Sequence, residues 1–205
     1  MDYGFKDLKD PNAYNVDRAK QLLAEDGWKD TDGDGILDKD GKPLTFDFVV
    51  YNSRAELPLY AEAVQADLKK VGIDMKIKTV DYNLIDKMGQ DGDYDMLISN
   101  IVTANTGDPI WFLANYWHTN VDGSNPQNGS GYSNPQVDQL LDAAETEFDP
   151  AKRRDYAIQI QQLLMNDGAA LFLGYPKTNI VTGSYLKGAV MYPSDYYWIT
   201  NKITK

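Results

Sequence analysis

The sequence predicts an α/β fold in which a mixed sheet is flanked by helices, and three patterns support this fold class. Residues 44–52 alternate apolar and polar side chains, residues 55–72 follow a helical period, and residues 73–80 alternate again. This order is typical of a βαβ unit, because parallel neighbouring strands need a crossover of a dozen or more residues. The nearly continuous apolar run at 94–102 suits a strand that is covered on both faces.

The remaining elements follow from helical periodicity and from residues typical of helix ends. Asn15 is the expected N-cap of the first helix and Gly27 its C-terminal stop. A proline stands near the first turn of each of the last two helices. The expected helices cover residues 16–26, 83–88, 109–117, 135–148 and 150–166. Two apolar segments, 169–176 and 179–183, are expected to form further strands.

Length and composition narrow the class of protein. The chain has 205 residues, with no internal repeat or linker, so we expect residues 1–205 to form a single α/β domain. A sequence without cysteine excludes disulfide frameworks, thiolate metal sites and cysteine nucleophiles. His118 is the only histidine, which excludes a multi-histidine metal site and leaves one imidazole for a serine-type triad. This composition favours binding over catalysis.

The charge balance limits the partners. The chain has 20 Lys and Arg against 31 Asp and Glu, which gives a formal net charge of −11. Such a surface disfavours nucleic acids and anionic membranes, since both attract clustered cations. No stretch is apolar enough to span a bilayer, and the start of the chain does not have the pattern of a signal peptide. The only tight basic cluster, at 152–154, is expected to lie on a solvated helix face.

An acidic, glycine-rich loop at residues 30–41 is the sharpest local pattern. Alternate carboxylates in a turn direct several hard oxygens at one centre, and Gly35 supplies the bend that calcium loops use. The candidate ligands of a structural Ca²⁺ are the side chains of Asp30, Asp32, Asp34 and Asp38 and the carbonyl of Ile36. Gly41 stands where a helix-loop-helix calcium motif needs a bidentate Glu, and a strand pattern follows the loop. A hairpin connection whose aspartates cap their own turns is therefore an equal alternative.

Polar and aromatic residues follow the apolar run at 94–102. Thr103, Asn105 and Asp108 come after the carboxyl end of this expected strand, where ligands bind in open α/β sheets. Trp111 and His118 belong to the aromatic segment WFLANYWH that comes next. Indole and phenol faces beside one imidazole suit a small-ligand surface, and the same aromatics are also suited to anchoring a short helix in the core.

Enzyme chemistry has little support in the residue pattern. Pairs such as Asp93/Asp95 and Glu145/Glu147 would suit a two-carboxylate hydrolase, but with 31 acidic residues such pairs occur by chance. Neither a GxxxxGK[ST] nor a GxGxxG phosphate loop occurs in the sequence. A hydrolase therefore remains only a minor alternative, and no cofactor is required.

Several segments, in order along almost the whole chain, resemble one known family. The amino-terminal part contains YNVDRAKQLLAEDGW, the acidic loop and GKPLTFDFVVYN, followed by VQADLKKVGIDMKIKTVD. The later part contains YDMLISN, a Gly-Asp-Pro step and YSNPQVDQLLDAAETEFDPAKRRDYAIQIQQLLMNDGAALFLGYP. Together they resemble the extracytoplasmic solute-binding proteins of peptide, nickel and opine ABC importers, known as family 5.

The resemblance implies a type II periplasmic-binding-protein-like lobe. Members of the family are at least twice this size and have two lobes around a cleft, so the chain is expected to be the carboxyl-terminal lobe alone. The implied function is that of the substrate-binding component of an ABC importer, which captures a peptide or a nickel chelate and delivers it to an ABC permease. The implied location is the periplasm or the outer face of the cell membrane, with a lipid anchor on a missing amino-terminal part. A calcium-stabilised extracellular binding or adhesion module is the alternative.

The resemblance also implies site residues. By position, Thr103, Asn105, Asp108 and Trp111 would line the cleft. In peptide-binding members an acidic residue holds the peptide amino terminus where this chain has Asn105. The ending of the chain is closer to the nickel-type subgroup, in which a cleft histidine assists binding, and His118 is the candidate for that role.

Overall fold

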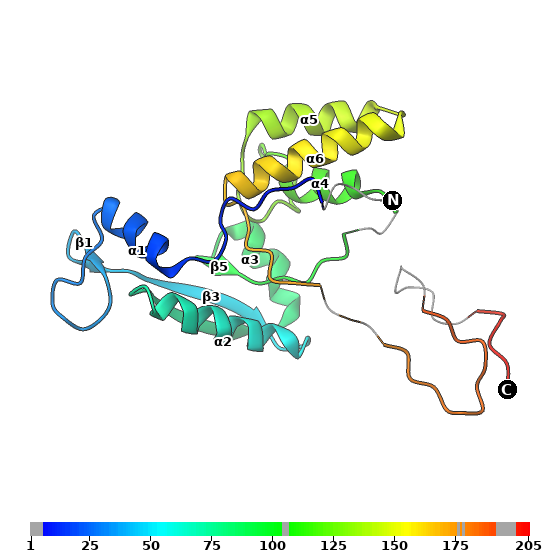
Figure 1. Ribbon diagram of the computed structural model, residues 1–205, viewed down its shortest axis with the longest axis horizontal. Helices are drawn as coiled ribbons and strands as arrows, with labels where there is room; N and C mark the ends of the chain where they lie inside the picture. The colour runs from blue at the N-terminus through cyan, green and yellow to red at the C-terminus, as the bar shows by residue number, and fades with distance from the viewer. Residues whose placement is uncertain (1–5, 104–106, 176, 178, 192–199) are drawn as a thin grey trace.

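The fold consists of a small parallel sheet with its helices and a bundle of three helices beside it (Figure 1). The computed structural model describes residues 6–103, 107–175, 177, 179–191 and 200–205. Each of the two units has its own cluster of buried apolar side chains. The sheet unit comes from the first half of the described chain, and the bundle from residues 109–166.

Three parallel strands form the sheet, in the order β4-β3-β5. They are β3 (Thr45–Tyr51), β4 (Asp74–Val80) and β5 (Met96–Leu97), and α2 (Glu56–Lys69) forms the crossover from β3 to β4. The predicted βαβ unit and the α/β fold class are therefore confirmed. The strand expected at 94–102 is shorter than predicted, although the Ile98 N–H still donates to the Val49 carbonyl at 3.1 Å.

The central strand β3 is covered on both faces toward its carboxyl end. Phe48, Val49, Val50 and Tyr51 are all buried, so neighbouring side chains that point to opposite faces of the sheet both avoid water. α2 packs along β3 and β4, and α3 (Ile85–Asp91) adds a buried isoleucine to the same cluster. Burial of an aliphatic or Phe side chain contributes roughly 1.5–3 kcal/mol. The tertiary cover therefore overrides the one-sided alternation predicted for this strand.

The amino-terminal part contains one helix and a short antiparallel pair. α1 (Val16–Glu25) begins where the sequence predicts, because the Asn15 side chain accepts a hydrogen bond from the Arg18 N–H at 2.9 Å. β1 (Asp38–Lys39) pairs with β2 (Lys42–Pro43) in antiparallel fashion at the end of the acidic loop. Parallel and antiparallel pairs are both present, but in separate sheets, since the three described strands of the larger sheet are all parallel.

The helix bundle consists of α4 (Pro109–Trp117), α5 (Pro135–Thr146) and α6 (Pro150–Asn166), close to the predicted ranges. Each helix begins with a proline, and the preceding residue accepts a backbone N–H with its side chain; these N-caps are Asp108, Asn134 and Asp149. Proline has no N–H group, so it leaves no unpaired donor at the first helical position. The side chain of the N-cap residue accepts one of the other N–H groups that have no partner within the helix. Throughout the described ranges, no helix combines the length and the apolar character needed to cross a membrane.

A close backbone contact joins the two units. η1 (Tyr82–Leu84) and α3 follow β4, in the region where the sequence predicts helical turns. Gly89 of α3 lies against Gly129 in the connection between α4 and α5, so close that a Cβ on Gly129 would be 3.1 Å from the Gly89 Cα. The Tyr94 hydroxyl donates a hydrogen bond to the Gly129 carbonyl. Two facing glycines therefore let the bundle approach the sheet unit.

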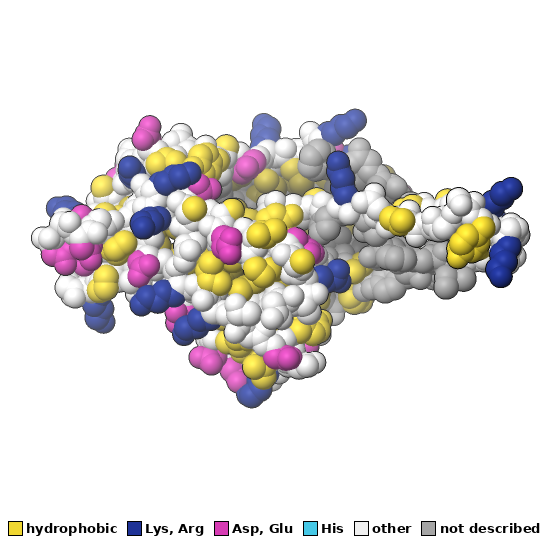
Figure 2. Space-filling model, turned by 90° about the horizontal axis from the view of Figure 1, so that it is seen from below, with side chains coloured by type: hydrophobic (Ala, Val, Ile, Leu, Met, Phe, Trp, Pro, Cys, Tyr) yellow, Lys and Arg dark blue, Asp and Glu magenta, His cyan; other side chains and the backbone are white. Residues whose placement is uncertain are grey.

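The carboxyl-terminal segment has no strand in its described residues, and the prediction of strands at 169–176 and 179–183 is wrong for them. The segment runs away from the bundle (Figure 1), and Figure 2 shows apolar side chains at its surface. Phe172 is 58% exposed and Val181 is 93% exposed. A strand needs a neighbour for its backbone hydrogen bonds, and no strand of the described chain pairs with this segment.

Replacing Gly129 by alanine is expected to destabilise the protein by roughly 1–3 kcal/mol, because the new Cβ meets the Gly89 backbone. The matched variant Gly89→Ala places its Cβ 3.6 Å from the Gly129 Cα, which is an ordinary contact. Alanine is also the better helix former by about 1 kcal/mol, so this variant should be as stable as the parent or more so. Urea unfolding compares the two variants, and equal losses would contradict a tight contact at this point.

Candidate ligand-binding site

The carboxyl ends of all three parallel strands lie at one edge of the sheet. β3 ends at Tyr51, whose hydroxyl accepts a hydrogen bond from the Asn100 N–H at 3.1 Å. This bond holds the segment after β5 against β3. The Tyr51 ring meets the ring of Tyr82, which follows β4, edge to face with a centroid distance of 5.1 Å. Ligands bind outside this edge in open α/β sheets.

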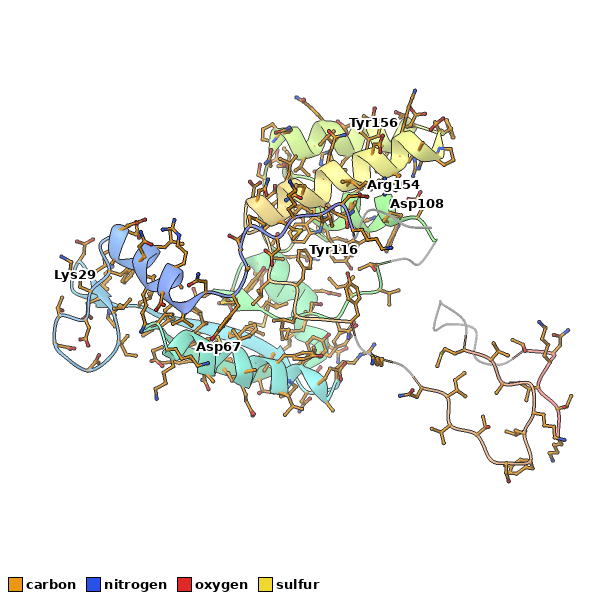
Figure 3. All side chains as sticks on the ribbon, in the orientation of Figure 1. Lys29, Asp67, Asp108, Tyr116, Arg154 and Tyr156 are labelled. Carbon is orange, nitrogen blue, oxygen red and sulfur yellow. The ribbon has the colours of Figure 1, made fainter. Side chains whose placement is uncertain are left out.

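Aromatic side chains lie at and beyond this edge. Tyr82 is 57% exposed, and Trp111 in the first turn of α4 is 39% exposed. Burial, assisted by the neighbouring Asp86 and Tyr82, raises the pKa of the Tyr116 hydroxyl. Figure 3 shows Tyr116 on the side of α4 that faces the sheet unit. We use the term edge surface for Tyr51, Tyr82 and Asn100, which lie at or shortly after the strand ends, together with Thr103 and Trp111 on the segment that leads from β5 into α4.

Two of the predicted ligand-binding residues belong to the edge surface. Thr103 is half-buried and follows β5, and Trp111 is exposed at the start of α4. Asn105 lies outside the described residues. The structure therefore places Thr103 and Trp111 on the connection from the sheet to the bundle, and their contact with a ligand stays a prediction.

Both carboxylate oxygens of Asp108 have partners inside the fold. One oxygen accepts the Ile110 N–H at 3.0 Å as the N-cap of α4, and the other forms an ion pair with Arg153 of α6. Arg153 also donates to the Glu147 carbonyl at 2.9 Å and to the Ala144 carbonyl, both at the end of α5. The Arg153 side chain is only 21% exposed, so the prediction of a solvated basic cluster is wrong for this residue. Asp108 thus has a structural role in addition to any contact with ligand.

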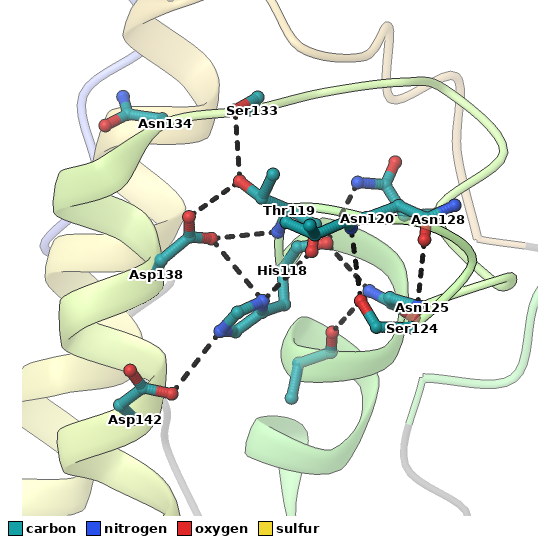
Figure 4. Close-up of polar contacts among 12 residues, drawn as sticks. His118, Thr119, Asn120, Ser124, Asn125, Asn128, Ser133, Asn134, Asp138 and Asp142 are labelled. Atoms are coloured by element: carbon teal, nitrogen blue, oxygen red, sulfur yellow. Dashed lines mark hydrogen bonds and ion pairs between the residues drawn. The ribbon is translucent and has the colours of Figure 1, made fainter.

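His118 lies at the opposite end of α4 from Asp108, and a helix of nine residues is roughly 14 Å long. Its Nε2 is 3.3 Å from the Asp142 Oδ1 (Figure 4). Its Nδ1 is 3.2 Å from the Thr119 carbonyl oxygen and 3.7 Å from the Asp138 Oδ1. The described partners of His118 are therefore in α5 and in the connection that follows α4, and its contact with a ligand stays a prediction.

The surroundings of His118 favour its protonated form. Partial burial of the ring lowers the pKa, but the Thr119 carbonyl and the carboxylates of Asp138 and Asp142 outweigh burial, so the pKa is raised above its ordinary value. The folded state therefore holds the proton more tightly than the unfolded state does. The resulting stabilisation is fully present below the ordinary histidine pKa and is lost as the pH rises through the folded-state pKa.

Asparagine side chains hold the connection that follows His118. The amide groups of Asn125 and Asn128 donate to the His118 carbonyl at 2.7 and 2.9 Å, and Asn128 also donates to the Tyr132 carbonyl at 2.8 Å. Asn128 is 4% exposed and is the one buried polar residue of the described chain. The connection between α4 and α5 is therefore fixed by side-chain bonds to backbone carbonyls.

The acidic loop brings together three of its predicted metal ligands. One carboxylate oxygen each from Asp30, Asp32 and Asp38 lie within 4.8 Å of one another. Asp34 is not part of this group, and its carboxylate accepts the Ile36 N–H at 2.8 Å. Three converging carboxylates offer hard oxygen ligands to a cation such as Ca²⁺.

The same carboxylates also cap the turns of the loop. Asp30 accepts the N–H groups of Gly33 and Gly35 at 2.7 and 3.0 Å. Asp38 accepts the N–H and the hydroxyl of Thr31 at 3.1 and 3.0 Å. Each oxygen has a second lone pair, so the self-capped turn and a bound cation are compatible.

Two exposed residues, Tyr82 of the edge surface and Arg54 after β3, are absent from the sequence-based prediction of the site. Tyr82 follows β4 by two positions, and Arg54 follows β3 by three. Arg54 is exposed, and the described residues provide no ion-pair partner for it. The signal that identifies both is their position directly after a strand of a parallel sheet.

A parallel sheet with an exposed aromatic edge and a helix bundle beside it is the architecture of an α/β binding protein. Residues 1–124 match the family described as bacterial extracellular solute-binding proteins, family 5 Middle. The chain belongs to this family of bacterial extracellular solute-binding proteins. The resemblance noted in the sequence is therefore confirmed.

Relatives of known structure agree with this assignment. Oligopeptide-binding protein AppA of Bacillus subtilis is 32% identical over 196 residues, which are 92% of this chain and 34% of AppA. The structure of AppA in complex with a nonapeptide aligns with a TM-score of 0.82 and 30% identity, over 97% of this chain and 39% of that chain. DppA from Helicobacter pylori, in complex with the peptide STSA, aligns with a TM-score of 0.73 and 26% identity, over 91% and 34% of the two chains.

A metal-binding relative aligns as well. Nickel-binding protein NikA of Staphylococcus aureus is 26% identical over 199 residues, which are 96% of this chain and 38% of NikA. Its structure in complex with Ni(L-His)2 aligns with a TM-score of 0.65 and 27% identity, over 79% and 31% of the two chains. These neighbours confirm the periplasmic-binding-protein-like fold. The chain spans about a third of the length of the curated relatives that it matches.

Removing the Asp108 side chain is expected to destabilise the bundle. Asp108→Ala loses both the cap of α4 and the partner of Arg153, and we expect a loss of roughly 2 kcal/mol. Asp108→Asn keeps a capping oxygen and should lose less, since only the charge of the pair disappears. Urea unfolding measures both variants, and equal stabilities of Asp108→Ala and the parent protein would contradict the structural role.

Asp142→Asn is expected to lower the pKa of His118, because it removes a carboxylate that stabilises the imidazolium. His118 is the only histidine, so its ring resonances in a proton NMR titration need no further assignment. The control Glu62→Gln removes a charge from α2 and should leave the pKa of His118 unchanged. A pKa that is equal in the parent and in Asp142→Asn would show that Asp142 does not act on the ring.

Proposed function

We propose that this chain supplies part of the ligand-binding surface of the substrate-binding component of an ABC importer. The observation that carries the proposal is the edge surface, in a chain that belongs to a family of extracellular solute-binding proteins. The partner of the complete unit would be an ABC permease. Its location would be the periplasm or the outer face of the cell membrane, with a lipid anchor.

Solute capture of this kind would rely on closure around the ligand. Because the relatives are about three times as long, we treat the chain as one lobe, the carboxyl-terminal one, of a two-lobe unit. Each lobe would provide part of the contacts, so the ligand would stabilise the closed form by its greater affinity for it. A single lobe should then bind only weakly.

The side chains at the edge suit an extended ligand with a carboxylate. The exposed faces of Tyr82 and Trp111 offer apolar contact area. Asn100 adds a polar side chain, whose Nδ2 lies 3.4 Å from the Glu56 carboxylate. Arg54 would pair with a ligand carboxylate through two parallel hydrogen bonds. Both a peptide and a metal chelate carry such a group.

A peptide is the favoured ligand of the two. The alignment with AppA covers more of this chain, and at a higher TM-score, than the alignment with NikA of Staphylococcus aureus. His118, the candidate for assistance to a metal chelate, is engaged by Asp142 at the far end of α4. A nickel chelate therefore serves as the second ligand in the test.

The proposed activity is binding without catalysis. In the first candidate carboxylate pair, Asp95 accepts the Asp47 N–H at 2.8 Å. In the second, Glu147 accepts the N–H groups of Phe148 and Asp149, each at 2.9 Å. The hydrogen bond from the Asp149 N–H is the main cause that lowers the pKa of Glu147; burial opposes it, and Lys152 and the Phe148 N–H lower the pKa further. A carboxyl held ionised in this way is a poor general acid.

Isotope-labelled protein titrated with a pool of oligopeptides, and separately with nickel-histidine, tests the proposal by NMR. We expect weak, saturable shifts at Tyr51, Tyr82, Asn100 and Trp111 with peptides, and loss of these shifts in Trp111→Ala. Phe148→Ala is the matched control, because Phe148 is 91% exposed at the corner between α5 and α6. Shifts with the nickel complex alone would favour the chelate as the ligand. Shifts with neither ligand would count against the proposed site.

We also propose that the acidic loop binds Ca²⁺ as a structural ion. The three carboxylates within 4.8 Å of one another support this proposal, since their mutual repulsion is relieved by a cation. Gly41 in place of the bidentate Glu of a helix-loop-helix site argues for modest affinity. A calcium-stabilised extracellular module thus remains compatible with the solute-binding function.

Thermal unfolding with Ca²⁺ or Mg²⁺ tests the calcium site. At a Ca²⁺ concentration ten times the Kd, binding adds ~1.4 kcal/mol, which raises the Tm by about 4 °C. Asp32→Asn keeps an oxygen for the Asp34 N–H but removes a charge, so it should abolish most of the increase. Asp40→Asn removes the same charge outside the three-carboxylate group and should retain it. An unchanged Tm with Ca²⁺ would contradict the calcium site and favour the alternative of a hairpin whose aspartates only cap its turns.

A further inference from the structure

A hollow lined mainly by polar residues lies at the carboxyl end of α4. Its volume is about 280 Å³, which gives room for several water molecules at roughly 30 Å³ each. It is formed by the last turns of α4, the asparagine-rich connection and one residue of α5. The lining residues are Ala114, Asn115, His118, Ser124, Asn125 and Glu145.

Each of the two amide side chains of the hollow donates from its Nδ2 to a backbone carbonyl. The Asn115 Nδ2 donates to the Trp111 carbonyl at 2.7 Å. The Asn125 Nδ2 donates to the His118 carbonyl at 2.7 Å and to the Ala114 carbonyl at 3.3 Å. These bonds fix which end of each amide is engaged, so both amide oxygens remain as acceptors. Neither oxygen accepts a hydrogen bond from another described residue.

A carboxylate without a partner completes the set. Glu145 is exposed, and the part of the chain that the structure describes gives it neither an ion pair nor a hydrogen bond. The imidazole of His118 is turned to the Thr119 carbonyl and Asp142, and no Lys or Arg lines the hollow. The end of α4 adds a partial negative charge from its last carbonyl groups. The hollow therefore combines acceptors with one carboxylate, and the charge of a protonated His118 is balanced by Asp138 and Asp142.

We propose that this hollow binds a small primary ammonium compound, with the ammonium group between the Glu145 carboxylate and the amide oxygens of Asn115 and Asn125. An ammonium group has three N–H donors and no acceptor, which matches this set of atoms. A metal ion fits less well, since a hard divalent cation depends on several charged oxygen ligands and the lining of the hollow supplies one carboxylate.

Titration of the isotope-labelled chain with 1,4-diaminobutane tests the proposal, and 1,4-butanediol serves as the uncharged analogue. We expect saturable shifts of the side-chain amides of Asn115 and Asn125 with the diamine and none with the diol. Ca²⁺ and Mn²⁺ form a separate arm of the experiment. Equal effects of diamine and diol, or saturable binding of a metal ion at these amides in place of the diamine, would overturn the proposal.

Variants separate the contribution of the hollow from general charge attraction. Glu145→Gln should weaken diamine binding at least fivefold, whereas Glu62→Gln removes the same charge from α2 and should leave binding unchanged. Asn115→Leu removes one acceptor without a change in charge and should also weaken binding. The backbone amide spectrum of each variant reports whether it is folded. Unchanged affinity in a folded Glu145→Gln variant, or equal losses in Glu145→Gln and Glu62→Gln, would contradict the assignment.

Discussion

The guanidinium group of Arg153 holds the ends of three helices together, and the helix bundle depends on it. From α6 it reaches Asp108, the N-cap of α4, and the last carbonyls of α5 at Ala144 and Glu147. Helix ends leave backbone groups without partners, and one planar cation with five N–H donors serves two of these ends at once. Because both side chains are partly buried, loss of either charge leaves the other charge less well compensated. The start of α4, and with it Trp111, is positioned by this interaction.

The second constraint is the contact between Gly89 and Gly129, which sets how closely the bundle approaches the sheet unit. Gly129 belongs to the asparagine-rich connection between α4 and α5, which also lines the hollow at the carboxyl end of α4. The edge surface combines residues after the strands with the first turn of α4, so its geometry depends on both units. The two ends of α4 therefore offer different chemistry. The exposed Trp111 lies in its first turn, and acceptor groups with a carboxylate surround the hollow at its carboxyl end.

The carboxylates of the acidic loop can both cap the turns of the loop and ligate a cation. Asp30 and Asp38 cap the turns of the loop, and together with Asp32 they converge closely enough to ligate a cation. The turn is complete without an ion, because each carboxylate has a backbone or hydroxyl donor. The uncompensated charge of the three carboxylates remains, and it is the physical reason to expect a cation there.

Local signals in the sequence were sufficient for the βαβ unit and for the starts of the bundle helices. Strand alternation, helical period and the Asp-Pro and Asn-Pro steps involve residues that are close in sequence, so they can be recognised without knowledge of the tertiary structure. The roles of Asp108 and Arg153 could not be predicted from the sequence, because their ion pair joins residues that are 45 positions apart. Likewise His118 follows Trp111 closely in sequence, but the length of α4 separates them in space. The carboxyl-terminal segments have strand-like sequences and form no strand among the described residues, since pairing needs a neighbour that only tertiary structure provides.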